Sequence, residues 1–261
     1  MSVTIALAGN PNCGKTTMFN ALTGANQYVG NWPGVTVEKK EGKLKNQKDV
    51  TVTDLPGIYS LSPYTLEEVV SRDYLLKEKP DVIIDLVDAT NIERNLYLAT
   101  QLLEIGIPVV IALNMVDLLK KNNIHINVKG LSSALGCPIV ETSALKGTGL
   151  KEVVDEAIKC ANQHRVPSKQ MEFPKAVEKA VNEIEGFVPA NIAEENKRWY
   201  AVKLLERDSK VKEGLNLPAS AQSRIEEIAS GLEKAEDDDT ESIVTDGRYQ
   251  YIQKVVSANV K

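Results

Sequence analysis

Residues Gly9–Thr16 read G-N-P-N-C-G-K-T, which fits the pattern G-x-x-x-x-G-K-[ST] of a phosphate-binding loop. The run before it, Val3–Ala8, is short, mostly apolar and β-branched, as expected for a buried strand. The run after it, Thr16–Leu22, has apolar residues at helical spacing and stops at Gly24. A strand, a glycine-containing loop and a helix in this order turn backbone N–H groups and the positive end of the helix dipole toward phosphate oxygens. The sequence therefore predicts a phosphate site at the start of the first helix.

Three further polar motifs follow in a fixed order, each directly after a run that is typical of a strand. In open α/β sheets, ligands bind at the carboxyl ends of the strands, so residues in these positions are expected to share one site. The motifs are D-L-P-G at Asp54–Gly57 after Val50–Thr53, N-M-V-D at Asn114–Asp117 after Val109–Leu113, and T-S-A-L at Thr142–Leu145 after Pro138–Val140.

The four motifs, in this order, resemble those of the Ras-like P-loop superfamily of GTPases. This resemblance implies an α/β fold with a doubly wound sheet, and GTP or GDP with Mg²⁺ as ligands. The residues that it implies for nucleotide binding are Asn10, Asn12, Gly14, Lys15, Thr16, Thr17, Asp54, Gly57, Asn114, Met115, Asp117, Ser143, Ala144 and Leu145.

The phosphate end of the predicted site can be assigned role by role. Lys15 is expected to reach the β- and γ-phosphates as a point charge, and the Thr16 hydroxyl to ligate Mg²⁺. Asp54 supplies a carboxylate that holds Mg²⁺ through a water, and Gly57 offers its backbone N–H to the γ-phosphate.

The base end favours guanine over adenine. The Asp117 carboxylate can accept both donors of the guanine Watson–Crick edge, whereas ATP would leave it buried and unpaired. Asn114 and the backbone N–H of Ala144 resemble the remaining base contacts of the superfamily. Met115 stands where the superfamily usually has lysine, and its flexible thioether can still lie on the base.

The loop between the first two motifs narrows the family. Residues Gly30–Glu38 read G-N-W-P-G-V-T-V-E and closely resemble switch I of the FeoB-type bacterial ferrous iron transporters. This resemblance implies that Thr36 ligates Mg²⁺ and senses the γ-phosphate. It covers nearly the whole chain, with further matches at Gly9–Thr16, Asp54–Ser62, Val87–Asn91, Glu93–Leu96, Leu113–Asp117 and Arg198–Glu206.

The catalytic set that the resemblance implies is Asn12, Lys15, Thr36 and Gly57, because the usual glutamine is missing. Ile58 takes its place after D-x-x-G, and isoleucine cannot orient a water by a side-chain hydrogen bond. In the relatives, an asparagine at the position of Asn12 and switch I carbonyls, here Gly30 and Trp32, hold K⁺ beside the phosphates. The alternative is that Asn12 only shapes the loop through local hydrogen bonds.

Two domains are expected. Residues 1–165 alternate strand and helix patterns, and a polar stretch with two prolines follows at Gln163–Pro174. Residues 166–261 show four apolar helix faces, at Val177/Val181/Ile184, Trp199/Val202/Leu205, Ile225/Ile228/Leu232 and Tyr249/Ile252/Val256. The FeoB resemblance implies a helical (GDI-like) domain that strengthens GDP binding, and then a polytopic iron-conducting region as partner; the ending at Asn259–Lys261, in mid-pattern, favours a truncated chain.

The composition is consistent with this interpretation. The net charge of −5 over 261 residues argues against a nucleic-acid partner, and no apolar run approaches the roughly 18 residues that span a bilayer. Three cysteines without C-x-x-C spacing indicate a reducing compartment. Together with this composition, the FeoB resemblance implies a slowly hydrolysing GTP switch for ferrous iron uptake, at the cytoplasmic face of the bacterial inner membrane. The alternative is a soluble GTPase of ribosome assembly or RNA modification, and the sequence leaves a homo-oligomer open.

Overall fold

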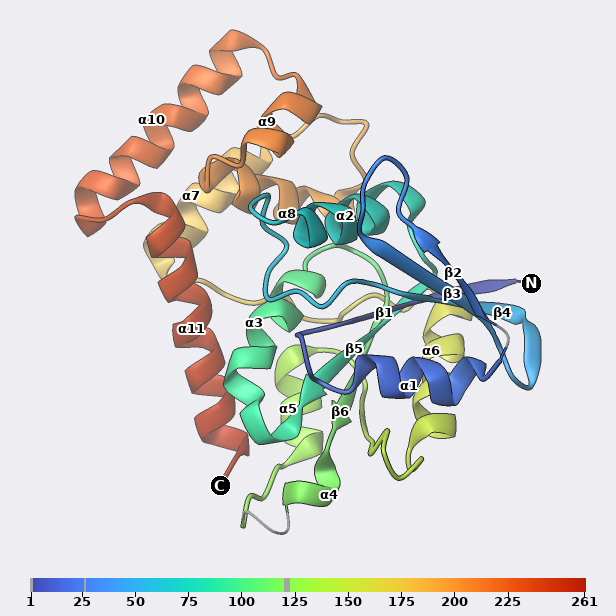
Figure 1. The fold of residues 1–261 in the computed structure, drawn as a ribbon. Helices are drawn as coiled ribbons and strands as arrows, with labels where there is room; N and C mark the ends of the chain where they lie inside the picture. Colours follow the sequence, from blue (N-terminus) through green and yellow to red (C-terminus); the bar gives the residue numbers. More distant parts are fainter. Residues whose placement is uncertain (1, 26, 120–122) are drawn as a thin grey trace. The chain divides into compact units, whose positions relative to one another are not determined.

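The computed structural model describes residues 2–25, 27–119 and 123–261 (Figure 1). The chain forms two compact units. The first comprises Met1–Leu103, Ile107–Gln170 and Val255–Lys261, and the second Glu104–Gly106 and Met171–Lys254. The predicted domain boundary between residues 165 and 166 stays a prediction.

One sheet runs through the first unit. Among the described residues it has seven strands in the order β2-β3-β4-β1-β5-β6-β7. Strands β4, β1, β5, β6 and β7 are parallel, whereas β2 and β3 pair antiparallel at one edge. Their bounds are β1 Val3–Gly9, β2 Gln27–Asn31, β3 Glu38–Leu44, β4 Gln47–Asp54, β5 Val82–Asp88, β6 Val109–Asn114 and β7 Ile139–Glu141.

Helices cover both faces of this sheet (Figure 1). The larger apolar side chains of β1, at Val3, Ile5 and Leu7, enter a core beneath α1 and α6, and α3 packs against β5 and β1 from the other side. The helices of the unit are α1 Lys15–Thr23, α2 Leu66–Asp73 with the π-helical turn η1 Tyr74–Glu78, the 3₁₀ turn η2 Ala89–Asn91, α3 Ile92–Leu102, α4 Val116–Leu119, α5 Val128–Leu135 and α6 Leu150–Asn162. The predicted doubly wound α/β fold is confirmed.

One local prediction differs from the structure. The stretch Gly30–Glu38, predicted as the switch I loop, begins inside strand β2 and ends at the first residue of β3. Helix α3 ends at Leu102, because the next turn leads to Gly106 with a φ of +82°. At this Gly106, a Cβ would lie 2.8 Å from the Glu195 carbonyl oxygen, so the backbones approach too closely for a side chain.

The second unit is helical, as predicted. Its helices are α7 Lys175–Glu185, α8 Glu194–Leu205, α9 Ser209–Leu215, α10 Ala219–Glu236 and α11 Thr240–Asn259, of which α9 was not predicted. The predicted faces are buried except that Ile228 is only half-buried and Tyr249 is exposed. In the part of α11 that belongs to this unit, Val244 and Ile252 are fully buried. A fully buried ion pair adds to this core, with Arg248 Nη2 2.7 Å from Glu104 Oε2.

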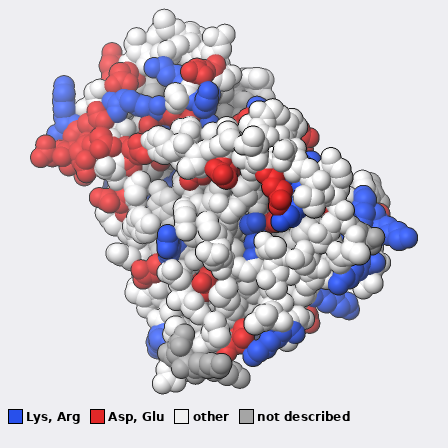
Figure 2. All heavy atoms as spheres, in the orientation of Figure 1, with Lys and Arg blue, Asp and Glu red and all other residues white. Residues whose placement is uncertain are grey.

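Charge on the surface is unevenly distributed (Figure 2). Acidic side chains gather where α10 meets α11, over the run Glu236–Asp239, and Lys and Arg side chains gather over the β3–β4 hairpin. Within the acidic run, Asp239 accepts hydrogen bonds from the backbone and the hydroxyl of Ser242 at 2.9 Å, so it caps α11. No helix in the described part of the chain is long and apolar enough to cross a bilayer.

Candidate nucleotide-binding site

The phosphate loop joins β1 to α1, and two of its glycines cannot carry a side chain. Gly14 has a φ of +95°, and a Cβ there would lie 2.4 Å from Asn114 Nδ2. A Cβ on Gly9 would lie 2.7 Å from Cys13 Sγ and 2.8 Å from the Leu86 carbonyl oxygen. The loop therefore folds tightly over the ends of β5 and β6 and brings the start of α1 to the sheet edge.

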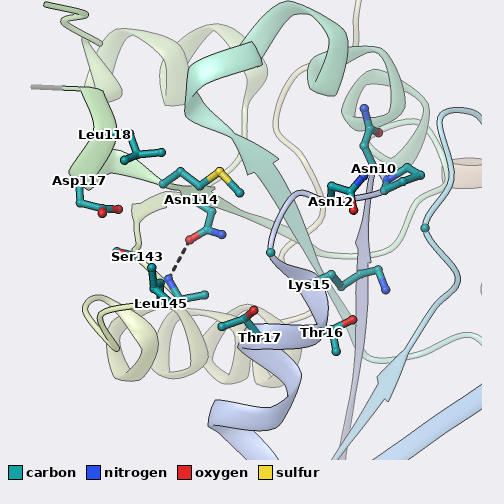
Figure 3. Close-up of a pocket in the computed structure, with 15 residues that line it drawn as sticks. Asn10, Asn12, Lys15, Thr16, Thr17, Asn114, Asp117, Leu118, Ser143 and Leu145 are labelled. Carbon is teal, nitrogen blue, oxygen red and sulfur yellow. Dashed lines mark hydrogen bonds between the residues drawn. The ribbon is translucent and has the colours of Figure 1, made fainter. Parts of the chain in front are cut away.

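A cavity of about 690 Å³ lies at this edge (Figure 3). It takes in residues from the loops after β1, β4, β6 and β7, as expected for an open α/β sheet. The lining residues are Asn10, Pro11, Asn12, Gly14, Lys15, Thr16, Thr17, Gly57, Asn114, Met115, Asp117, Leu118, Ser143, Ala144 and Leu145. The structure thus brings together every residue predicted for nucleotide binding except Asp54, and adds Pro11 and Leu118.

Asp54 does not line the cavity itself, but it contacts Lys15, which does. The Lys15 Nζ is 2.6 Å from its Oδ1, and both side chains are buried. Burial raises the pKa of the Asp54 carboxyl, and the positive charge of Lys15 opposes that rise. Asp54 and Lys15 therefore form the charged floor of the phosphate end, which Lys15 and Thr16 mark in Figure 3.

Asn114 ties the phosphate loop to the last motif. Its Nδ2 donates to the Cys13 carbonyl at 2.8 Å, and its Oδ1 accepts from the Ala144 N–H at 3.0 Å and from Thr142 Oγ1 at 3.2 Å. In this conformation the Ala144 N–H that was predicted to contact the base is bonded to Asn114. Asn114, the asparagine of N-M-V-D, thus links the phosphate loop to the loop after β7 and sets the spacing between them. We call these hydrogen bonds of Asn114 the Asn114 brace.

Asp117 stands at the other end of the cavity, beside Ser143 and Leu145 (Figure 3). Its Oδ2 lies 3.3 Å from Lys146 Nζ. A hydrogen bond from Ser143 and the Lys146 ammonium lower the pKa of the Asp117 carboxyl, so it is an acceptor at neutral pH. Lys146 was missed from the sequence, although its position in the loop after T-S-A-L was a signal that could have found it.

The predicted switch I residues lie apart from the cavity. Gly30 is paired with Lys39 in the β2–β3 hairpin, and Thr36 is exposed in the turn that follows β2. Trp32 is buried with its ring 5.2 Å from that of Tyr74 in η1. None of the described residues 27–38 lines the cavity. This conformation therefore does not bring Thr36, Gly30 and Trp32 together with Asn12.

Asn12 is poised toward the phosphate end. It has a φ of +66° and an exposed side chain that lines the cavity. The Asn12 side chain makes no hydrogen bond within the described residues, so local hydrogen bonds do not explain the presence of asparagine at this position. Its neighbour Asn10 is buried and donates to the Arg94 carbonyl, and the Asn10 Oδ1 has no partner in the described structure.

Two residues near the cavity, Ile58 and Cys13, offer no reactive side chain to a bound nucleotide. Ile58 is buried, and its backbone N–H donates to the Gly9 carbonyl at 3.2 Å. Burial raises the pKa of the Cys13 thiol to about 12, with the charge of Asp85 adding to the rise, so the reactive thiolate is disfavoured. The side chain of Cys13 packs in the core under α1.

The fold, the phosphate loop at a helix start and an acidic acceptor at the far end of one cavity define a P-loop domain of the Ras-like GTPase class. Residues 3–157 match the family described as "Ferrous iron transport protein B", and residues 173–261 match "FeoB cytosolic helical domain". The chain belongs to the FeoB family of ferrous iron transport proteins.

Individual relatives agree with this assignment. The Fe(2+) transporters FeoB of Escherichia coli K12 and Shigella flexneri are each 40% identical over 263 residues, which is 97% of this chain and 33% of theirs. The chain thus spans about a third of the length of these curated relatives. Nothing in these relatives supports the alternative of a ribosome-assembly or RNA-modification GTPase.

Solved structures of S. thermophilus proteins are similar along the whole chain. The GDP-bound A143S mutant of the S. thermophilus FeoB G-domain is 47% identical with a TM-score of 0.96, covering 99% of this chain and 100% of that one. The mGMPPNP-bound NFeoB of S. thermophilus is 48% identical with a TM-score of 0.86, covering 98% of this chain and 96% of that one.

Proposed function

We propose that this chain binds GTP and GDP with Mg²⁺, hydrolyses GTP slowly, and serves as the nucleotide switch of a ferrous iron uptake protein. One observation carries the proposal. A single cavity joins the phosphate loop at Lys15 to the acceptor Asp117, with the Asn114 brace fixing the span between them. The two S. thermophilus structures described above are bound to GDP and to mGMPPNP, which supports a guanine nucleotide here.

The base end supports guanine by its chemistry. The Asp117 carboxylate is ionised and lines the cavity. It can accept hydrogen bonds from the N1–H and the 2-amino group of guanine together. To do so it exchanges the exposed Lys146 for the base. Leu118 and Leu145 are exposed apolar side chains on the same lining, suited to cover the faces of a planar ring.

The residues at the phosphate end fit Mg²⁺ in their donor chemistry. A hydroxyl from Thr16 and a carboxylate from Asp54 are the hard oxygen donors that this ion prefers. When bound, the ion neutralises charge that builds up between the phosphates. The chain supplies Lys15 as a point charge and Gly57 as a backbone donor at the cavity wall.

Hydrolysis in this proposal depends on switch I. Thr36 and the carbonyls of Gly30 and Trp32 have to leave the hairpin conformation, in which the Trp32 carbonyl accepts from Val35 N–H at 3.2 Å. The Asn12 side chain lines the cavity, and we propose that it joins them in holding K⁺, which would stabilise negative charge on the phosphates. The buried Ile58 offers no side-chain donor or acceptor to water, which is consistent with slow turnover.

The wider function follows from the family. The curated relatives named Fe(2+) transporter FeoB are about three times as long, so we propose that the rest of such a protein is the membrane region that this switch controls, at the cytoplasmic face of the bacterial inner membrane. The net charge of −5 gives no reason to expect a nucleic-acid partner, and a homo-oligomer stays an open proposal.

The nucleotide is tested by exchanging one acceptor for a donor. Wild type is expected to bind GDP and GTP well above ADP and ATP in equilibrium titrations. Asp117→Asn should lose guanine affinity and gain affinity for xanthine nucleotides, since the exchange inverts the hydrogen-bond polarity. Asp155→Asn, an exposed aspartate on α6, is the matched control. Unchanged relative affinities for guanine and xanthine in Asp117→Asn would contradict the proposal.

A further inference from the structure

The E-R-N-L stretch at Glu93–Leu96 lies outside the lining of the cavity. It forms the first turn of α3, directly after β5 and the short turn η2. Asn95 fixes this turn, because its Oδ1 accepts from the Asp88 N–H at 3.2 Å and its Nδ2 donates to the Asn91 carbonyl at 2.9 Å. The position of the neighbouring Arg94 is therefore set by the end of the strand.

Arg94 touches two segments of the site. Its backbone carbonyl accepts a hydrogen bond from Asn10 Nδ2 of the phosphate loop at 3.4 Å. Its guanidinium carbon lies 4.5 Å from the centre of the Tyr59 ring, a cation–π distance. Tyr59 is 43% exposed and stands two residues after Gly57.

The segment that Tyr59 belongs to is docked on the phosphate loop. The Ile58 N–H donates to the Gly9 carbonyl at 3.2 Å. A Cβ on Gly57 would lie 3.1 Å from Pro11 Cα, so the two backbones are in close contact there. Through this docking Gly57 lines the phosphate end of the cavity.

We propose that Arg94 is a positioning residue that holds Gly57 at the phosphate end through its contact with the Tyr59 ring. Helix α3 fixes the position of Arg94, whose guanidinium contacts the Tyr59 ring on one side of the docked segment. On the other side, the Ile58–Gly9 hydrogen bond holds the same segment on the phosphate loop. The inference rests on the proposed function, in which the Gly57 N–H meets the γ-phosphate. Loss of the contact should therefore weaken GTP binding and leave GDP binding unchanged.

The experiment compares two nucleotides across a mutant cycle. An exposed cation–π contact shifts an equilibrium about 2- to 5-fold, which sets the expected size. Arg94→Ala and Tyr59→Ala should each reduce affinity for GMPPNP by that factor while GDP affinity stays at the wild-type value. The double variant should lose no more than either single variant, and Tyr59→Phe should retain wild-type affinity because it keeps the ring. Glu93→Ala, at the exposed neighbouring position, is the control.

Amide hydrogen exchange without nucleotide gives a second measurement. The Ile58 N–H should exchange faster in Arg94→Ala and Tyr59→Ala than in wild type and Glu93→Ala. Unchanged exchange, additive losses in the double variant, or equal losses for GDP and GMPPNP would each overturn the positioning role. If wild type binds neither nucleotide, the proposed function fails, and the exchange measurement still decides whether Arg94 holds the segment.

Discussion

The Lys15 Nζ lies 2.6 Å from Asp54 Oδ1, so the cation predicted to reach the phosphates is held by the carboxylate predicted to hold Mg²⁺. Both side chains are buried, and Asp54 has its pKa raised by burial against the opposing charge of Lys15. A nucleotide that draws Lys15 to its phosphates removes the counter-ion of Asp54. The freed carboxylate then needs a new cation, and the proposed Mg²⁺ would be that cation. We therefore expect the ion pair to couple phosphate binding to metal binding.

Asp54→Asn tests this coupling. The amide can no longer hold Lys15 by charge or compensate Mg²⁺, so the strengthening of nucleotide binding by Mg²⁺ should fall by about 10- to 100-fold. Without Mg²⁺, GDP affinity should be equal to or above that of wild type, because Lys15 is no longer shared. Titrations with Mg²⁺ and with a chelator measure both quantities. Asp49→Asn, on the exposed part of β4, is the control, and an unchanged Mg²⁺ effect in Asp54→Asn would count against the role of this residue.

Thr36→Ala should act on hydrolysis alone. Thr36 is exposed and lies outside the cavity in this conformation, so removing its hydroxyl should change neither stability nor GDP affinity. If switch I closes over the γ-phosphate as proposed, turnover of GTP should fall by about 10²-fold. Single-turnover assays beside GDP titrations separate the two effects. A variant that hydrolyses GTP at the wild-type rate would remove Thr36 from the mechanism.

Asp85 predicts a pH dependence of stability. It is buried in the middle of β5, its Oδ2 has no hydrogen-bond partner in the described structure, and desolvation raises its pKa to about 7 from the usual 3.8. Because the folded state holds the proton more tightly, its contribution to stability is fully present below pH 3.8 and is lost as the pH rises to about 7.

Asp85→Asn should therefore be more stable than wild type at pH 8, by a few kcal/mol in order of magnitude, and the gain should vanish near pH 4. Urea unfolding between pH 4 and 8 measures it, with Asp155→Asn as an exposed control. A constant difference across this range would show that Asp85 keeps its charge in the folded protein.

The sequence was sufficient for the parts of the site that local spacing determines. Gly9–Thr16, Asp54–Gly57, Asn114–Asp117 and Thr142–Leu145 each follow a strand, and the parallel sheet brings all four to one edge. The FeoB resemblance of switch I is likewise confirmed by the family match.

Pairings between distant residues could not be predicted from these patterns. The Asn114 brace joins residues that are 101 positions apart, and the Lys15–Asp54 bond spans 39. Residues Gln27–Asn31 carry no strong strand alternation and become a strand only because β3 lies beside them. The roles of Thr36, Gly30 and Trp32 stay predictions, because they require a different arrangement of the same hairpin.

A bound cation can replace the charge that a catalytic side chain would supply. Ile58 is buried and cannot orient water, and the described part of switch I lies off the cavity. Asn12 is a polar side chain that lines the phosphate end of the cavity and has no hydrogen-bond partner among the described residues. If it helps hold K⁺, GTP turnover at constant ionic strength should be faster in K⁺ than in Na⁺. A single contact of this kind changes the rate by about 10²–10³-fold, which is the upper limit expected for the ratio of turnover in K⁺ to turnover in Na⁺.

Asn12→Ala should abolish the difference between the two salts and leave GDP affinity and stability near wild type, since the side chain supports no loop contact among the described residues. Asn162→Ala, an exposed asparagine at the end of α6, controls for the loss of an amide. Turnover in K⁺ that equals turnover in Na⁺ in wild type would mean that another charge stabilises the transition state. A variant that keeps its K⁺ stimulation would instead place the ion on other ligands, and Asn12 would then serve only the left-handed turn of the loop, where its φ is +66°.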